Sequence, residues 1–393
     1  MPSPSRAISN LKGQPMFQIF TRCKELELAG KRIRHFELGD PNFATPQSIT
    51  EAAVTALRDG KTHYVSSRGD NDLLEAIQIA TSHSRQFTPE KSQITVTPGA
   101  NAGIFYALKA ICDPGDEILI PNPYFPTYIA AAHLAGAEVC FYPLSASNQF
   151  RPCATELRSL VGSRTKAILI NSPSNPTGAV FDESTVEFIY KLAAEYDLYV
   201  ISDEVYARMI FDKAAKFYTP ATIDQCKERT VIINGFSKTF AMTGWRIGAV
   251  IAPSDLSERI TVISESIVSC VPGFIQSAAR QALLAPLSET SEMYAAYRSR
   301  QLALTLEFSK VEGIECSLPQ GSMYVFPSIH RISRSSESFA MHLLSETGVA
   351  CVPGSYFGSQ GEGHLRFSCA GEDRDIDGLS FLIQQAITSY QGN

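Results

Sequence analysis

The feature that most constrains the fold is the alternation of short apolar segments with helical segments between residues 48 and 285. Seven of these apolar segments have the length and composition of buried strands. Strands that alternate with helices predict a mostly parallel sheet covered by helices on both faces. We therefore expect an α/β fold with strands near 94–97, 117–120, 138–142, 167–171, 198–202, 231–234 and 247–251.

The pattern changes from residue 286 onward, where one long helix over 289–312 is followed by shorter elements. This order is typical of an α+β layer. Residues 1–47 predict an arm with one helix, roughly 16–30, which we expect to pack on this layer because chain termini often lie together. We predict a large domain over 48–285 and a small domain formed by 1–47 and 286–393. In the small domain we expect strands near 314–318, 323–327 and 364–369, and helices at 336–347 and 373–390.

Composition and charge exclude several classes of protein. The chain has 34 basic and 40 acidic residues, a net charge of -6, which gives no electrostatic reason to bind nucleic acid or an anionic membrane. No apolar stretch approaches the roughly 20 residues that span a bilayer, and the first ten residues carry no apolar signal region. The nine cysteines form no C-x-x-C pair and the histidines show no metal-ligand spacing, so we assign no metal. We expect a soluble, cytoplasmic protein.

Polar residues follow the ends of several predicted strands. Gly99, Asn175, Asp203 and Lys238 each come just after such an end. Ligands of open parallel sheets bind outside the carboxyl ends of the strands. We therefore expect these four residues to meet at one edge of the sheet.

Three segments carry a family resemblance. They read SKTFAMTGWRIG at 237–248, SDEVY at 202–206 and NPTG at 175–178. In this order and spacing they resemble the class I and II aminotransferases, which are pyridoxal-phosphate enzymes of fold type I, and the likeness extends from residues 36–41 to 366–368. The resemblance implies a large domain with a mostly parallel seven-stranded sheet, a smaller α+β domain, and pyridoxal 5'-phosphate as cofactor. It also implies transfer of an amino group between an amino acid and a 2-oxo acid by a ping-pong mechanism.

The resemblance assigns the central chemistry to three residues. Lys238 holds the cofactor aldehyde covalently and then moves the substrate α-proton, which requires an amine that is partly neutral. Asp203 keeps the pyridine nitrogen protonated, and Tyr206 and Asn175 meet the ring hydroxyl. The alternatives are a solvated surface lysine, an aspartate that caps a helix and a tyrosine that only packs.

The cofactor phosphate needs fixed donors, which the resemblance places on both sides of the lysine. Ser237 and Arg246 match the family's phosphate ligands. Gly99, Ala100 and Asn101 open a helix, where free N–H groups and the helix dipole favour an anion. Taken alone, Pro-Gly-Ala-Asn is also compatible with an ordinary strand–helix turn.

Further contacts are implied for the ring, the neighbouring subunit and the substrate. Tyr124 stacks on the pyridine face, unless it is a core aromatic. Tyr64 reaches the phosphate of the neighbouring subunit, which implies a homodimer with shared active sites; the alternative is a loop tyrosine with local contacts. Arg366 grips the substrate α-carboxylate through two parallel hydrogen bonds, assisted by Asn175 and the Gly39 N–H, unless it is a surface arginine.

Substrate choice depends on two departures from the aspartate-specific bacterial branch. That branch often has a lysine where this chain has Asn101, and a tryptophan where it has Phe125. Residues 13–17 would cover the site with apolar side chains. We therefore favour a neutral or aromatic amino donor over aspartate, with 2-oxoglutarate a plausible acceptor. We also expect Asn122–Pro123 and Asn175–Pro176 to be cis.

Two other functions stay open. A β-lyase, a cyclising synthase or a decarboxylating condensation enzyme would share the lysine, aspartate and arginine. A non-catalytic ligand-binding regulator is the second alternative. It is disfavoured because about 35 residues, not rich in basic side chains, precede the first family motif, and because every expected site residue is present.

Overall fold

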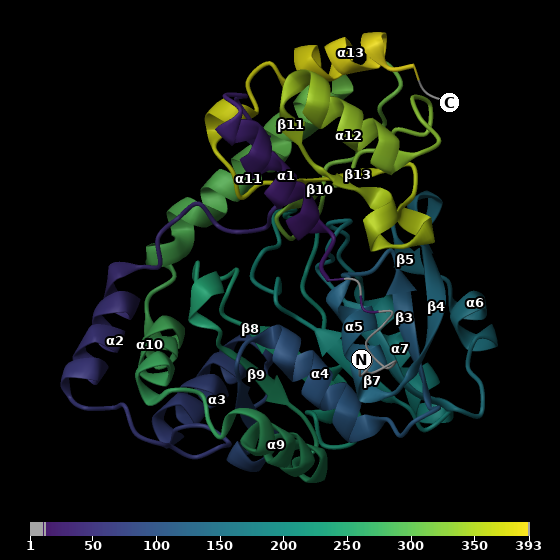
Figure 1. Cartoon of the computed structure of the whole chain (residues 1–393). Coiled ribbons are helices and arrows are strands. Elements are labelled where there is room, and N and C mark those ends of the chain that lie inside the picture. Colours follow the sequence, from purple (N-terminus) through teal and green to yellow (C-terminus); the bar gives the residue numbers. More distant parts are fainter. Residues whose placement is uncertain (1–10, 12, 392–393) are drawn as a thin grey trace, which may run out of the picture.

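The computed structural model describes residue 11 and residues 13–391. Its main sheet runs in the order β2-β9-β8-β7-β6-β3-β4-β5 (Figure 1). The strands from β8 through β4 are parallel, β9 is antiparallel to both of its neighbours, and β5 is antiparallel to β4. The seven predicted strands are all present, and the two-residue β5 is an eighth. Their bounds are β2 Ile94–Thr97, β3 Glu117–Asn122, β4 Glu138–Ser145, β5 Arg151–Pro152, β6 Thr165–Asn171, β7 Tyr199–Asp203, β8 Thr230–Gly235 and β9 Gly248–Ile251.

Helices cover both faces of this sheet, as the alternating pattern predicts. One face packs against α3 (Asn71–Arg85), α7 (Glu183–Glu195) and α10 (Gly273–Leu284), and α2 (Gln47–Arg58) packs on α10. The other packs against α4 (Ala100–Ile111), α5 (Thr127–Ala135) and α9 (Ser254–Val268). Because the inner strands are buried on both faces, β6, β8 and β9 each contain a short apolar run. Helices α9 and α10 were not predicted from the sequence. Two shorter helices, α6 (Ala154–Ser159) and α8 (Ala221–Asp224), complete this part.

A second layer lies over the carboxyl edge of the main sheet (Figure 1). It contains an antiparallel sheet of β10 (Tyr324–Val325), β13 (Leu365–Ser368) and β12 (Val352–Pro353), and a parallel pair of β1 (Arg34–His35) and β11 (Val349–Ala350). Its helices are α11 (Ser288–Ser309), α12 (Ser336–Thr347) and α13 (Leu379–Ser389). These elements share one core.

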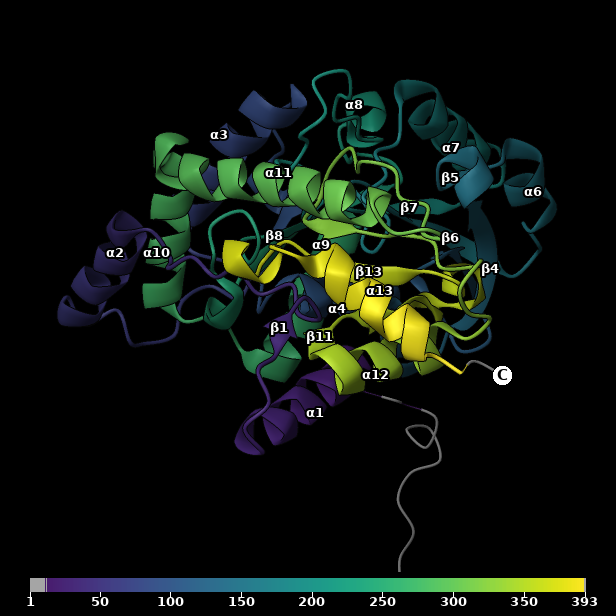
Figure 2. The same ribbon diagram turned by 90° about the horizontal axis from the view of Figure 1, so that it is seen from above.

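Helix α1 (Met16–Leu28) packs on this second layer, as its predicted place at the terminus suggested (Figure 2). Its Ile19 and Cys23 are buried with Leu344 and Val352. The strand predicted over 314–318 is wrong, because that segment forms only an isolated bridge between Glu315 and Ser328. The last helix begins later than residue 373, because a 3-10 turn precedes it. The division into domains at residues 47 and 285 stays a prediction.

Among the residues that the structure describes, no helix has both the length and the apolar composition needed to cross a membrane.

Candidate active site

A cavity of about 450 Å³ opens between the carboxyl edge of the main sheet and the second layer. Strands β6, β7 and β8 end at this edge, so residues far apart in the chain meet there. Ten of the predicted site residues line the cavity. They are Gly39, Ala100, Asn101, Asn175, Asp203, Tyr206, Ser237, Lys238, Arg246 and Arg366.

Lys238 lies just after β8 and points into this cavity. Its Nζ donates a hydrogen bond of 2.5 Å to the carbonyl oxygen of Gly39. Burial lowers the pKa of Lys238, and the positive charges of Arg366 and Arg246 lower it further, against the opposing effect of Tyr324 and Asp40. The site therefore favours the neutral amine more than water does.

Asp203, the last residue of β7, is held from two sides. Its Oδ2 accepts a hydrogen bond of 2.6 Å from the hydroxyl of Tyr128, and its Oδ1 accepts one of 3.2 Å from the backbone N–H of Val205. The Asn171 amide also donates to the Asp203 carbonyl oxygen at 3.1 Å. Burial raises the pKa of Asp203 to about 6, while the Tyr128 hydrogen bond acts in the opposite direction. A buried carboxylate of this kind favours a cationic partner.

Arg366, on β13, is 2% exposed and forms the opposite wall. Its Nη1 donates to Oδ1 of Asn175 at 3.2 Å, and its Nη2 donates to the carbonyl oxygen of Glu37 at 2.5 Å. The guanidinium lies 4.5 Å from the ring centre of Tyr324 and 5.0 Å from that of Phe357. The buried Nε has no hydrogen-bond partner among the described residues. A planar cation fixed in this way can bind a carboxylate.

Arg246 and the start of α4 form an anion-binding corner. Gly99 precedes α4 with φ of 91°, and a Cβ at this position would lie 2.5 Å from Nη2 of Arg246. Only glycine therefore combines this backbone conformation with room for the guanidinium. The Nη1 of Arg246 donates to the Thr243 carbonyl oxygen at 2.8 Å. A cation beside the N–H groups of a helix start attracts a phosphate.

Three predicted residues, Tyr64, Gly99 and Tyr124, do not line the cavity of their own chain. Tyr124 turns away and stacks on Phe141 with ring centres 5.2 Å apart, while the next residue, Phe125, lines the cavity. Tyr64 is 87% exposed and lies outside the cavity. Gly99 contributes through the guanidinium of Arg246 and does not itself line the cavity.

Several lining residues were not found from the sequence. Tyr128 and Asn171 hold Asp203, as described above, and Tyr324 lies 3.0 Å from the hydroxyl of Tyr206, oxygen to oxygen. Tyr128 could have been found from its place on the helix that follows Pro123. Tyr324 had no local signal, because it lies on a two-residue strand.

Comparison with known proteins gives the family. The family model described as "Aminotransferase class I and II" matches residues 33–379. The chain is 33% identical to an aspartate aminotransferase of Musicola paradisiaca over 96% of this chain and 94% of that protein. It is 38% identical to aromatic-amino-acid aminotransferase 2 of Thermococcus litoralis, over 85% and 86% of the two chains. The solved aspartate aminotransferase of Rhizobium meliloti superposes with a TM-score of 0.94 at 29% identity, covering 99% of both chains.

The chain belongs to the class I and II aminotransferases. It is an α/β protein of fold type I and a transaminase, and enzymes of this family use pyridoxal phosphate. The described residues fit this cofactor: a buried carboxylate, a lysine of lowered pKa and an anion-binding corner line one cavity. Because Gly99 has no Cβ, the guanidinium of Arg246 can lie beside the start of α4.

The N-terminal segment of the aminotransferase closes one side of the cavity, as expected for residues 13–17. Gln14, Met16 and Phe17 line it, and the Gln14 amide donates to the Thr127 hydroxyl at 3.1 Å. The bonds Asn122–Pro123 and Asn175–Pro176 are both cis, as predicted, and Ser172–Pro173 is a third cis bond.

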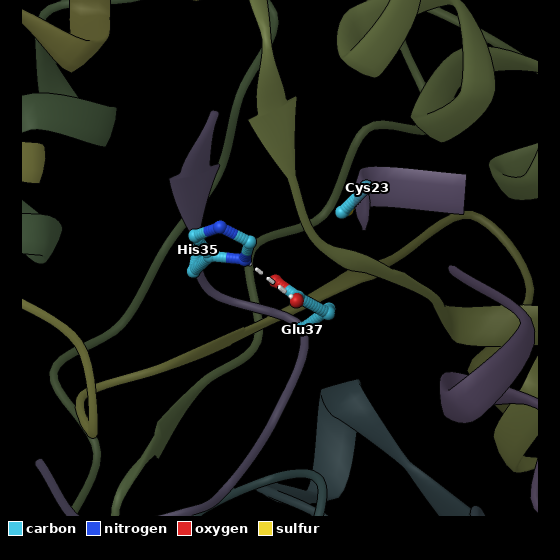
Figure 3. Close-up of side chains that lie close together, drawn as sticks. All are labelled: Cys23, His35 and Glu37. Atoms are coloured by element: carbon cyan, nitrogen blue, oxygen red, sulfur yellow. Dashed lines mark hydrogen bonds and ion pairs between the residues drawn. The ribbon is translucent and has the colours of Figure 1, made fainter. Parts of the chain in front are cut away.

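Behind Arg366, the aminotransferase brings Cys23, His35 and Glu37 together, with potential ligand atoms within 4.8 Å of one another (Figure 3). His35 Nδ1 lies 2.9 Å from Oε1 of Glu37, and its Nε2 lies 3.0 Å from Oε1 of Glu27. Burial and these two carboxylates act on the ring in opposite directions, and the Glu37 hydrogen bond prevails, raising the pKa of His35 to about 9. The arrangement is that of an imidazolium between two carboxylates. That the chain binds no metal stays a prediction.

Proposed function

We propose that this aminotransferase takes its amino group from an amino acid with a neutral or aromatic side chain and passes it to a 2-oxo acid in two half-reactions at one site. The observation that carries this proposal is the set of cations in the cavity. Among the described lining residues these are Lys238, Arg246 and Arg366. Each has a proposed task, so the described lining residues leave no cation for a second substrate carboxylate.

The side-chain end of the cavity supports the same choice. Met16, Phe17, Leu38 and Phe125 offer apolar surface there, and Asn101 offers an uncharged amide. Burial of an apolar substrate side chain against such surface is favourable by about 25 cal/mol per Å². The relatives include both an aspartate and an aromatic aminotransferase, so family membership alone does not choose between these donors.

The bound cofactor supplies an aldehyde for the amino group and a protonated pyridine ring that accepts electrons from the substrate α-carbon. We propose that Asp203 keeps the ring nitrogen protonated, and that Tyr128 keeps Asp203 ionised by donating to it. Lys238 holds the aldehyde in the resting enzyme. When the substrate amine has taken its place, the neutral Nζ of Lys238 would carry the proton between the substrate α-carbon and the aldehyde carbon of the cofactor.

We propose that the other residues fix position. Arg366, with Asn175 and the Gly39 backbone, orients the substrate α-carboxylate, and the hydrogen bond from Nη1 of Arg366 to Asn175 keeps these two side chains together. Ser237, Arg246 and the α4 start at Gly99, Ala100 and Asn101 hold the phosphate. Tyr206 donates to the ring hydroxyl together with Asn175. Phe125, and not Tyr124, provides the aromatic surface against the ring.

We also propose a homodimer in the cytoplasm in which Tyr64 of one subunit completes the phosphate site of the other. The exposure of Tyr64 and its place outside its own cavity support this arrangement. Measurement of the mass in solution, and of cofactor affinity in Tyr64→Phe, would test it. The proposal would be contradicted if the wild type were a monomer in solution, and if Tyr64→Phe bound the cofactor as tightly as the wild type does.

The donor test follows the absorbance of the holoenzyme after it is mixed with single amino acids, without an oxo acid. Neutral and aromatic donors should convert the cofactor stoichiometrically to its aminated form, whereas a β-lyase, a cyclising synthase or a non-catalytic regulator would not do so. Turnover of aspartate and glutamate alone would overturn the proposed preference. Asn101→Lys should raise kcat/KM for aspartate about tenfold relative to phenylalanine, whereas Lys109→Asn, on the same helix, should leave that ratio unchanged.

A further inference from the structure

A second cavity of about 150 Å³ lies on the other side of the wall that carries Asp203 and Lys238. It is bounded by α3, by the segment after Asp203 and by the segment around Lys238. Glu204 and Thr239, which line it, are the chain neighbours of Asp203 and Lys238, and Val205 lines both cavities. None of the roles assigned above uses this space.

The charges of this second cavity do not balance. Arg85 is matched by Glu204, with Nε and Oε2 2.6 Å apart, and its Nη2 donates to Oδ1 of Asn234 at 2.9 Å. Arg208, which also lines the cavity, forms no ion pair or side-chain hydrogen bond with any residue that the structure describes; its guanidinium lies 5.5 Å from the ring centre of Phe240. The lining therefore carries one positive charge in excess.

The surroundings make this excess charge costly. Burial lowers the pKa of Arg208, and the charge of Arg85 adds to that effect against the influence of Tyr294. Arg208 is half-buried, and a charge that is partly withdrawn from water without a partner loses part of its hydration without compensation. An anion beside Arg208 would supply that compensation.

The rest of the lining is largely apolar. Ile77 and Ala80 of α3, Phe217 and Leu283 line the space. A cavity of about this volume with apolar walls holds one benzene-sized molecule. An inorganic anion would meet Arg208 and leave these walls uncovered.

We propose that this cavity is a second ligand site, which binds a small monocarboxylate with an apolar body of about one ring, its carboxylate on Arg208. Such a ligand would contact residues bonded directly to Asp203 and Lys238. Its chemical class overlaps that of the proposed substrates and products, so a metabolite of the reaction is a natural occupant. The proposal rests on the residues that line this second cavity and not on the proposed function, and its test does not measure activity.

The test uses crystals of the holoenzyme soaked with 4-bromobenzoate, in which bromine is located by its anomalous scattering. A peak is expected in the second cavity for the wild type and for Arg298→Met, a change of an exposed arginine on α11. Arg208→Met keeps the length of the side chain without its charge and should lose the peak. In solution, the rise in melting temperature caused by benzoate should be smaller for Arg208→Met than for Arg298→Met, as expected for an affinity weakened roughly tenfold or more.

A second variant tests the volume of the cavity and leaves the charge of Arg208 in place. Ala80→Phe should fill the cavity and also remove the bromine peak. A wild-type crystal with bromine at the active site alone, or with none, would overturn the proposal. So would equal occupancy by 4-bromobenzyl alcohol, which has the same ring but no charge.

Discussion

The hydroxyl of Tyr128 donates a 2.6 Å hydrogen bond to the carboxylate of Asp203, at the end of β7. This bond joins the first turn of α5 to the residue that we propose faces the cofactor nitrogen. It opposes the effect of burial, which raises the pKa of Asp203 to about 6. Tyr128 is therefore a positioning residue that favours the ionised carboxylate.

Tyr128→Phe should lower kcat/KM about tenfold, because a hydrogen bond to a charged group contributes roughly 1.5–3 kcal/mol. It should also weaken cofactor binding, measured by the absorbance of the bound cofactor. Tyr142→Phe is the matched control, since this buried hydroxyl donates to the Leu169 carbonyl oxygen at 2.8 Å, away from the site. Equal losses in the two variants would mean that Tyr128 acts only through packing.

Lys238→Ala should abolish covalent attachment of the cofactor and reduce amino transfer by roughly 1,000-fold, the range expected for loss of a general base. Reduction with borohydride followed by mass spectrometry checks the attachment directly. The wild type and Lys213→Ala, a change of an exposed lysine, should both gain the mass of the cofactor. Attachment of that mass to Lys238→Ala would show that another amine holds the aldehyde.

Arg85→Met should destabilise the protein by about 3–5 kcal/mol, because it leaves the carboxylate of Glu204 buried without its partner. Thermal unfolding of the holoenzyme measures the change. Lys191→Met removes an exposed pair with Glu187 and should cost less than about 0.5 kcal/mol. If Arg85→Met lost as little stability as the control, the buried carboxylate of Glu204 would not need Arg85 as its partner.

His35 should make stability depend on pH. Its pKa is raised from 6.5 to about 9 in the folded protein, so its contribution is complete below pH 6.5 and is lost as the pH rises through 9. His35→Gln should therefore be less stable than the wild type by about 1–2 kcal/mol at pH 6, a partial effect because the side chain is 32% exposed. The difference should shrink by pH 10. Melting temperatures across this range give the comparison, and His133→Gln, an exposed histidine on α5, should show no such trend.

The main sheet and three site residues, Asn175, Asp203 and Lys238, could be predicted from local signals, whereas the other predicted site residues depended on the family resemblance. Buried parallel strands appear as apolar runs, and the residue after each run must lie at the same edge. Helices α9 and α10 were missed although Leu256 and Ile260 repeat at helical spacing and are buried. The short strands β1, β11 and β12 have too few residues for any period to be visible.

Side-chain direction was the part that the sequence could not supply. Tyr124 and Phe125 are adjacent aromatic residues, and the course of the chain after β3 decides which of them reaches the cavity. The grouping of Cys23, His35 and Glu37 likewise depends on α1 packing beside β1 and β11. Contacts of this kind join segments of the chain that no sequence pattern links, so they could not be predicted.

Residues 37–39 offer two main-chain oxygens to two of the cations in the active site, Arg366 and Lys238. Because these acceptors belong to the backbone, no exchange of side chains in that tripeptide removes them. A ligand that moves both cations away from this tripeptide would break both of these hydrogen bonds. That stretch continues back to α1, whose Met16 and Phe17 border the cavity, so the segment that accepts hydrogen bonds from both cations is joined in the chain to the arm that closes one side of the site.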